Sequence, residues 1–174
     1  MKIGVTKNPA PKPKPDPKAL GFGKYYTDHM LVMDYFDGAW GEPAILPYGH
    51  ISLDPSCMVF HYGQELFEGL KAYPAPNGDV LLFRPDKNAA RFNSSAARIS
   101  IPTIPEEVFV QCVRALVDVD RDWVPTAPET SLYIRPFCFA TEPSVSVHPS
   151  KSYKFMVILS PVGPDYSTGL TPAS

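Results

Sequence analysis

Two arginines in this sequence, Arg91 and Arg135, stand where a side chain could bind an anion. Arg91 lies about a turn and a half into a helix that Asp86 is expected to cap. The first turns of a helix offer unpaired N–H groups and the positive end of the helix dipole, which suit a phosphate or a carboxylate. A solvated surface arginine is the alternative interpretation of the same residue.

Arg135 lies in a predicted strand two residues after Tyr133, so both side chains point to one face, which Phe137 and Phe139 continue. A cation among aromatic neighbours is costly to bury without an anionic partner. That partner is either Glu142, in a structural ion pair, or the carboxylate of a ligand held in an aromatic pocket. Both interpretations stay open on these residues alone.

Other polar side chains nearby have no partner at a spacing that supports catalysis. His61 could be a general base, but no nucleophile or metal ligand accompanies it, and Tyr62 could pack in the core or turn its hydroxyl to a ligand. Glu65 and Glu68 are expected on the solvated face of a helix. The sequence has no phosphate-binding glycine loop, nucleophile elbow or HExxH motif. These residues therefore predict an aromatic pocket with arginines for an anion.

Alternating strand and helix patterns are expected to position these side chains. Apolar residues at helical spacing predict helices over 58–73 and 86–98, and a third that begins near Ile104 and has the most regular apolar stripe. Short apolar runs beside turn signals predict strands at 30–36, 44–48, 79–83, 132–140 and 153–160. Strands in a meander with helices on one side indicate an α+β fold.

The composition describes a folded domain that follows an extended segment. The chain has 174 residues, 44% of them hydrophobic, which is enough for one domain with a real core, expected over 20–165. Residues 8–18 alternate proline with mostly charged or small residues, and residues 1–19 carry five lysines and one aspartate, so a disordered Pro/Lys-rich tail over 1–19, outside the fold, is expected. The remaining residues carry 11 basic and 17 acidic side chains, which argues against nucleic-acid binding.

The cysteines and the apolar runs indicate where such a protein resides. Cys57, Cys112 and Cys138 are odd in number and widely spaced, which suggests neither a disulfide framework nor a zinc site. No apolar run approaches the ~20 residues that span a bilayer, and no signal peptide is apparent. The expectation is a soluble, cytoplasmic protein without membrane or metal partners.

Taken together, these motifs resemble the branched-chain amino-acid aminotransferases, which are class IV pyridoxal-phosphate enzymes. The similar segments span residues 20–170 and include Glu65–Lys71, Leu82–Pro85, Ser131–Pro136, Thr141–Ser144 and Ser160–Pro164. The resemblance implies the small N-terminal domain of the D-amino-acid-aminotransferase-like fold (fold type IV), an antiparallel sheet with helices. It also implies a homodimer that transfers an amino group between leucine, isoleucine or valine and 2-oxoglutarate, with glutamate as the other amino acid.

The resemblance implies a role for Arg91 and for three aromatic residues. Arg91 is similar to the residue that holds the phosphate of the cofactor, pyridoxal 5'-phosphate. The aromatic residues are similar to walls of the pocket for the aliphatic side chain: Tyr26, Phe67 and Tyr133. Relatives with the same fold but other substrates, such as D-amino-acid aminotransferase or aminodeoxychorismate lyase, are disfavoured by this aromatic set.

Four more residues gain expected roles from the same resemblance. Tyr62 and Arg135 are similar to the pair that receives the distal carboxylate of glutamate, with Tyr62 contributed across the dimer. Val145 and Val147 resemble part of a loop that closes over the partner subunit's site.

One essential part of such an enzyme is not matched. In this family the Schiff-base lysine lies in a second domain, and no lysine here matches it, so the 174-residue chain alone is expected to be inactive. Residues 166–174 are expected to begin the interdomain linker, and Asp165, followed by Tyr166, stands where many relatives have an aromatic residue. A non-catalytic binding or oligomerisation module derived from the same domain is the alternative.

Overall fold

Two long antiparallel strands form the centre of the molecule. In the computed structural model, which describes residues 1–164, β8 (Ser131–Ala140) and β9 (Tyr153–Val162) pair along their whole length. The described strands join one sheet in the order β1-β4-β2-β9-β8-β6-β7, with β3 on β2 and β5 on β8. The shorter strands are β1 (Gly4–Val5), β2 (His29–Phe36), β3 (Ala39–Trp40), β4 (Ala44–Pro47), β5 (Glu65–Phe67), β6 (Leu70–Pro74) and β7 (Val80–Leu82). The expected α+β fold is confirmed, and every pairing is antiparallel except β1 with β4.

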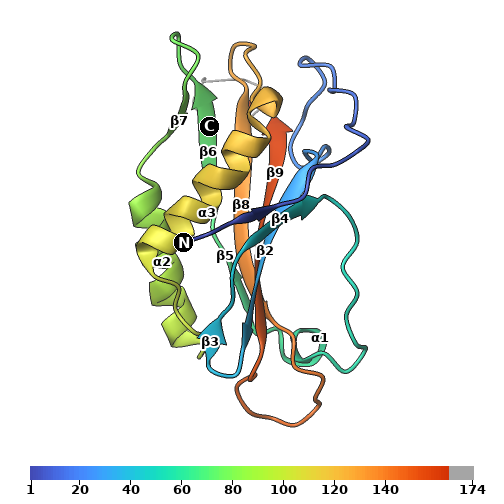
Figure 1. Cartoon of the computed structure of the whole chain (residues 1–174), viewed down its shortest axis with the longest axis vertical. Helices are drawn as coiled ribbons and strands as arrows, with labels where there is room; N and C mark the ends of the chain where they lie inside the picture. Colours follow the sequence, from blue (N-terminus) through green and yellow to red (C-terminus); the bar gives the residue numbers. More distant parts are fainter. Residues whose placement is uncertain (165–174) are drawn as a thin grey trace, which may run out of the picture.

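Two helices, α2 (Pro85–Arg98) and α3 (Glu106–Val119), lie across one face of this sheet (Figure 1). The α3 helix begins with two acidic residues at the positive end of its dipole. Its predicted apolar stripe is buried at Phe109, Cys112, Val113, Leu116 and Val117. Phe92 of α2, Phe109 of α3 and Phe155 of β9 meet with ring centroids 5.3–5.7 Å apart. The main core therefore lies between the helices and the central strands.

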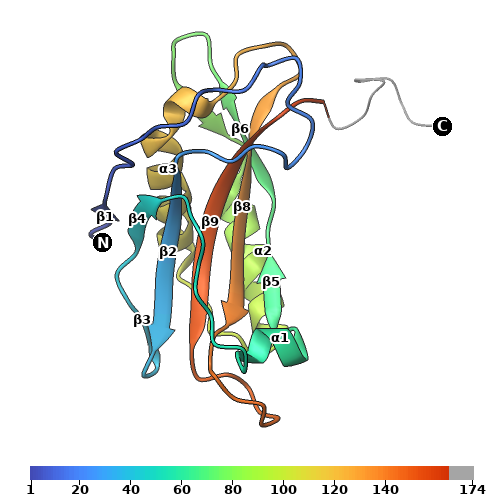
Figure 2. The ribbon, with the colours of Figure 1, turned by 90° about the vertical axis from the view of Figure 1, so that its right-hand side faces the viewer.

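The side chains of β8 point alternately into that core and to the opposite face of the sheet. Leu132, Ile134 and Cys138 are buried in the core cluster that α2 and α3 cover. Tyr133 and Arg135 point to the other face because successive strand residues alternate. In the view of Figure 2, α1 (Met58–Tyr62) and the loop between β8 and β9 lie at one end of the sheet, and the N-terminal segment passes the other end.

The predicted helix over 58–73 is wrong beyond its first turns. The α1 helix ends at Tyr62, where Gly63 adopts the left-handed conformation (φ 59°) that terminates helices. The following residues become β5, which pairs with β8, and β6, which pairs with β8 and β7. Hydrogen bonds to the central strand outweigh the local helical spacing. A smaller error concerns α2: its N-cap is Arg84 (φ 46°), and Asp86 lies inside the first turn.

Residues 1–19 are not the disordered tail that the sequence predicts. Gly4 and Val5 form β1, and the Asn8 backbone N–H donates to Nε2 of buried His29 at 2.8 Å. The Lys12 ammonium donates to the carbonyls of Tyr26 and Thr27, both at 2.7 Å, and the Lys12 N–H donates to Asp28 at 2.8 Å. Buried polar groups need partners, and this segment supplies them to residues 26–29.

Lys12→Met is therefore expected to destabilise the protein. The two carbonyls would lose a charged donor, which corresponds to about 1–3 kcal/mol in the free energy of unfolding. Urea unfolding of the variant and of Lys18→Met measures the effect, because the Lys18 side chain is exposed and its substitution is expected to change nothing. Equal midpoints for both variants would mean that the Lys12 contacts do not stabilise the fold.

The cysteines are packing residues. Cys57, Cys112 and Cys138 are free and buried, and burial raises the pKa of Cys112 and of Cys138 to about 12. A thiol that stays protonated in an apolar environment is inert, so the predicted buried role of Cys112 is confirmed. Within residues 1–164, no helix combines the length and apolarity needed to cross a bilayer.

Candidate functional site

A pocket of about 160 Å³ opens on the face of the sheet that α2 and α3 leave uncovered. Two central strands and the segment before β2 contribute its walls: Phe22, Gly23, Tyr26, Tyr133, Arg135, Ile158 and Ser160. Three residues with an expected site role, Tyr26, Tyr133 and Arg135, thus lie around one cavity. The pocket is thus formed by residues 22–26 together with β8 and β9.

The segment before β2 is fixed to the end of β9 by backbone hydrogen bonds. The Thr27 N–H donates to the carbonyl of Leu159 at 3.1 Å, and the Gly163 N–H donates to that of Gly21 at 3.0 Å. Tyr26 stacks on Tyr48 with ring centroids 5.2 Å apart, which fixes the plane of the Tyr26 wall.

Arg135 is a cation between aromatic rings. Its guanidinium carbon lies 4.1 Å from the centroid of the Phe67 ring and 5.4 Å from that of Tyr133. One guanidinium nitrogen donates to the Tyr133 hydroxyl at 2.8 Å, and Nε is buried without a hydrogen-bond partner among residues 1–164. Attraction to the rings holds the cation in place but leaves its charge uncompensated.

The structure does not contain the ion pair between Arg135 and Glu142 that was the alternative. Glu142 instead accepts from the Lys151 N–H at 2.7 Å and lies 3.2 Å from Nε2 of His148. These contacts hold the pKa of Glu142 below its usual range. The structural ion pair with Glu142 is therefore not formed, and the hydrogen-bond partner of the Arg135 side chain among residues 1–164 is the Tyr133 hydroxyl.

Arg91 is held by a buried carboxylate. Its Nε and one terminal nitrogen donate to the two oxygens of Glu68 at 2.6 and 2.7 Å, a bidentate geometry. Asn88, one helical turn earlier on α2, donates to the same carboxylate at 2.9 Å. The Glu68 side chain is 3% exposed whereas that of Arg91 is 68% exposed. The pair thus presents the outer edge of a fixed guanidinium to the surface.

Glu68 corrects the expectation of a solvated helical face. It lies between β5 and β6, and its backbone N–H donates to the carbonyl of Pro136 in β8, which draws the side chain inward. Burial is the largest single influence and raises the pKa of this carboxyl. The hydrogen bonds from Arg91 and Asn88, the positive charge of Arg91 and the Gly69 backbone N–H together outweigh burial and bring the pKa below its ordinary value of 4.5. The ionised carboxylate therefore stabilises the fold.

Glu68→Gln is expected to lower Tm by several degrees at neutral pH and by much less in acid. A group with a lowered folded-state pKa stabilises fully above its ordinary value of 4.5 and loses this contribution as the pH falls through the folded pKa. Thermal unfolding measured from neutral pH to below pH 4.5 gives the effect on Tm. Glu65→Gln is the control because Glu65 is exposed on β5. A Tm difference that does not change with pH would show that the charge of Glu68 is not responsible.

Tyr62, Val145 and Val147 lie apart from this pocket. The Tyr62 hydroxyl donates to the carbonyl of Val145, and Val147 is 87% exposed in the same loop. Figures 1 and 2 place α1 and this loop together at one end of β8. Within one chain, Tyr62 therefore contacts the β8–β9 loop, and the hydrogen-bond partner of Arg135 is Tyr133.

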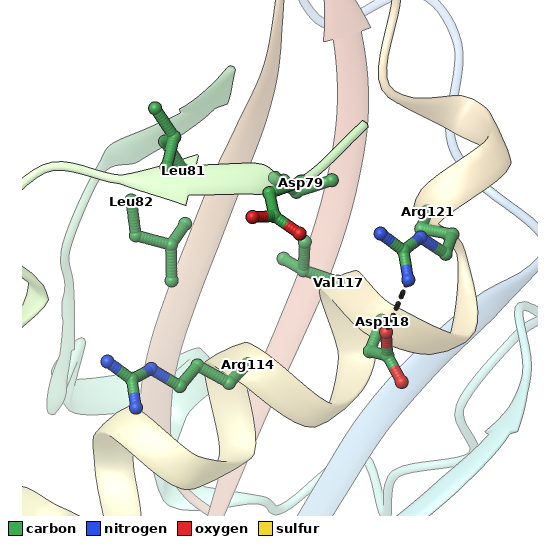
Figure 3. A pocket seen from close by; sticks show the side chains of 8 residues that line it. Asp79, Leu81, Leu82, Arg114, Val117, Asp118 and Arg121 are labelled. Carbon is green, nitrogen blue, oxygen red and sulfur yellow. Dashed lines mark hydrogen bonds and ion pairs between the residues drawn. The ribbon is translucent and has the colours of Figure 1, made fainter. Parts of the chain in front are cut away.

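A second and larger hollow, of about 570 Å³, lies between β7 and α3 (Figure 3). It contains none of the residues expected in a site. Its two arginines, Arg114 and Arg121, stand at opposite ends in Figure 3, and Arg121 pairs with Asp118 at 3.4 Å. The charges do not converge, so this hollow is not an anion site. Within residues 1–164, no three His, Cys, Asp or Glu side chains are grouped to hold a metal ion.

Comparison with curated proteins decides the family. No family model matches the chain. It is 56% identical to branched-chain-amino-acid transaminase 1 of Bacillus subtilis (strain 168) over 156 residues, which are 89% of this chain and 44% of that protein. The branched-chain-amino-acid aminotransferase of Mycolicibacterium smegmatis is 54% identical over 88% of this chain and 42% of its own length. The chain belongs to the branched-chain amino-acid aminotransferase family. It spans less than half the length of these relatives.

Solved structures of the family share the fold. The branched-chain amino acid aminotransferase of Escherichia coli aligns with a TM-score of 0.54 at 20% identity, over 75% of this chain and 39% of that one. A second branched-chain amino acid aminotransferase, complexed with 4-methylvaleric acid, aligns with a TM-score of 0.54 at 25% identity, over 74% of this chain and 40% of that one. The expected fold type IV is confirmed.

Two buried polar residues, Glu68 beside Arg91 and Ser160 in the pocket, are not predicted as site residues from the sequence. Glu68 is expected to be solvated when the strands on either side of it are predicted as one helix. Ser160 precedes Pro161 at the end of a predicted strand, and nothing local shows that its side chain faces Tyr133 across the sheet. Both depend on pairings between residues far apart in the chain.

Proposed function

We propose that this chain is the N-terminal domain of a branched-chain amino-acid aminotransferase that acts on leucine, isoleucine or valine with 2-oxoglutarate. The observation that carries the proposal is Arg135, a cation between aromatic rings without a carboxylate partner among residues 1–164. The side chain of the branched-chain amino acid brings an alkyl group to the pocket, and that of 2-oxoglutarate brings a distal carboxylate. Aromatic walls suit the first, and the arginine suits the second.

The residues also fit pyridoxal 5'-phosphate, whose phosphate Arg91 would hold. The fit rests on the guanidinium, which Glu68 orients from inside while its outer N–H groups stay exposed. A solved relative, a branched-chain amino acid aminotransferase complexed with N-(5'-phosphopyridoxyl)-L-glutamate, aligns at 26% identity with a TM-score of 0.52. When bound, this cofactor supplies an electron-withdrawing ring for amino-group transfer.

The chain's own groups would bind and orient the substrate. Tyr26 and Tyr133 are placed to pack on an alkyl side chain, and Phe67 supports Arg135 from one side. The Arg135 Nε–H is available to a carboxylate oxygen, and the Tyr133 hydroxyl, which accepts from Arg135, keeps its proton for donation. The Arg135 Nε is buried from bulk water, which strengthens this recognition.

A homodimer in the cytoplasm is part of the same proposal. Tyr62 of α1 and Val145 and Val147 of the β8–β9 loop are exposed and do not line the pocket, which supports a role at the partner subunit's site. The three free, buried cysteines support a reducing compartment.

The test uses the 174-residue chain and the protein encoded by the complete gene. The complete protein with pyridoxal 5'-phosphate is expected to form glutamate from leucine and 2-oxoglutarate, and the 174-residue chain alone is expected to form none. Glutamate is measured in an endpoint assay, with 2-oxoglutarate omitted as the control. A reading frame that ends at Ser174, or an inactive complete protein, would refute the proposal.

A further inference from the structure

Two buried polar atoms in the pocket have no hydrogen-bond partner among residues 1–164: Nε of Arg135 and Oγ of Ser160. Ser160 is 3% exposed, so bulk solvent does not satisfy its hydroxyl. Most buried side-chain polar atoms in folded proteins are hydrogen-bonded, and an exception needs a reason. Both exceptions line the same cavity, which indicates that a ligand group is their partner.

The sheet register places both side chains on one face. Ser160 of β9 stands opposite Tyr133 of β8, and Ile158 stands opposite Arg135. Ser160 and Arg135 are therefore diagonal neighbours, roughly 7–8 Å apart by sheet geometry. Leu159, next to Ser160, is fully buried in the core on the other side. Strand alternation thus keeps the Ser160 hydroxyl in the pocket.

The chemistry of the two atoms selects a ligand class. The Arg135 Nε–H can only donate, and the serine hydroxyl can donate, so an acceptor with more than one oxygen satisfies both. A carboxylate is such a group, whereas an alkyl side chain would leave both atoms buried and unpaired. A site that binds a polar group in this way strongly discriminates against ligands that lack it.

We propose that Ser160 is a specificity residue that donates a hydrogen bond to the distal carboxylate of a dicarboxylate ligand, beside Arg135. The inference rests on the proposed function and adds a residue to it. Ser160 distinguishes the dicarboxylate from the aliphatic substrate in the same pocket, and it has no part in binding the alkyl group.

The experiment compares two ligands with the complete, cofactor-loaded protein. Glutarate is the dicarboxylate probe and 4-methylvalerate is the aliphatic monocarboxylate probe, and their Kd values are measured by calorimetry. Ser160→Ala is expected to raise the Kd of glutarate about 10-fold, as for a lost hydrogen bond to a charged group, and to change that of 4-methylvalerate less than about twofold. The matched control is Ser131→Ala, since Ser131 is a buried serine of the same sheet that does not line the pocket.

Thermal unfolding of the ligand-free protein separates a binding role from a structural one. Removing a buried hydroxyl without a partner is expected to leave the Tm of Ser160→Ala equal to that of the wild type or higher. A lower Tm with equal weakening of both ligands would make Ser160 structural and overturn the inference. Unchanged glutarate binding would overturn it while the proposed function stands, and a wild-type protein that binds neither ligand would refute both.

Discussion

Replacing Arg91 by methionine in the complete protein is expected to weaken the binding of pyridoxal 5'-phosphate by about 100-fold or more. Arg91 presents an exposed guanidinium edge from α2, and a phosphate that accepts two charge-assisted hydrogen bonds from that edge would lose both. Equilibrium dialysis of the cofactor measures the change in Kd. Arg98→Met, a substitution in the last turn of the same helix, is the control and is expected to retain the cofactor.

The single Arg91 substitution also leaves Glu68 buried without its cation, so part of its effect will be a loss of stability. The double variant Arg91→Met with Glu68→Gln removes that unpaired charge. We expect the double variant to recover most of the Tm without recovering the cofactor. Recovery of cofactor binding together with the Tm would show that Arg91 acts only through the fold.

Arg135→Met in the complete protein is expected to raise the KM for 2-oxoglutarate much more than the KM for leucine. The KM for 2-oxoglutarate should rise about 100-fold because the distal carboxylate loses its cation in an environment where charge pairs are strong. The KM for leucine should change less than about threefold, since methionine keeps the apolar stem against Phe67. Steady-state kinetics with each substrate varied in turn gives both values.

The control for Arg135 is Arg114→Met, which removes an arginine from the hollow between β7 and α3 and is expected to leave both KM values unchanged. An equal rise for leucine and 2-oxoglutarate with Arg135→Met would mean that the arginine maintains the shape of the pocket. The aromatic contacts of Arg135 would then be its main function.

Local patterns in the sequence predict those features of the fold that depend on residues close together in the chain. The spacing of Tyr133 and Arg135 places both on one face of β8, and the apolar stripe of α3 gives its buried side, and both predictions are confirmed. The helix over 58–73 fails because β5 and β6 are stabilised by pairing with β8, far along the chain. Local periodicity contains no information about such a partner.

In the candidate site, too, the sequence predicts residues from their local position and misses partners that are distant in the chain. Arg91 is a candidate because it lies early in a helix, but its buried partner Glu68 is missed together with the strands around it. The contacts of the N-terminal segment are missed because its partners, such as His29 and Asp28, lie 21 and 16 residues further along the chain, and no local pattern pairs them. Residues whose role depends on distant chain pairing are those that the sequence alone does not reveal.

The alternation in β8 and β9 has a consequence for how this protein family diversifies. Leu132, Ile134 and Leu159 fill the core under the helices, while their chain neighbours Tyr133, Arg135 and Ser160 line the pocket. A substitution on the pocket side leaves the volume of the core unchanged, so its stability effect stays small. A lineage can therefore change which acids it recognises one residue at a time while keeping the same foldable scaffold.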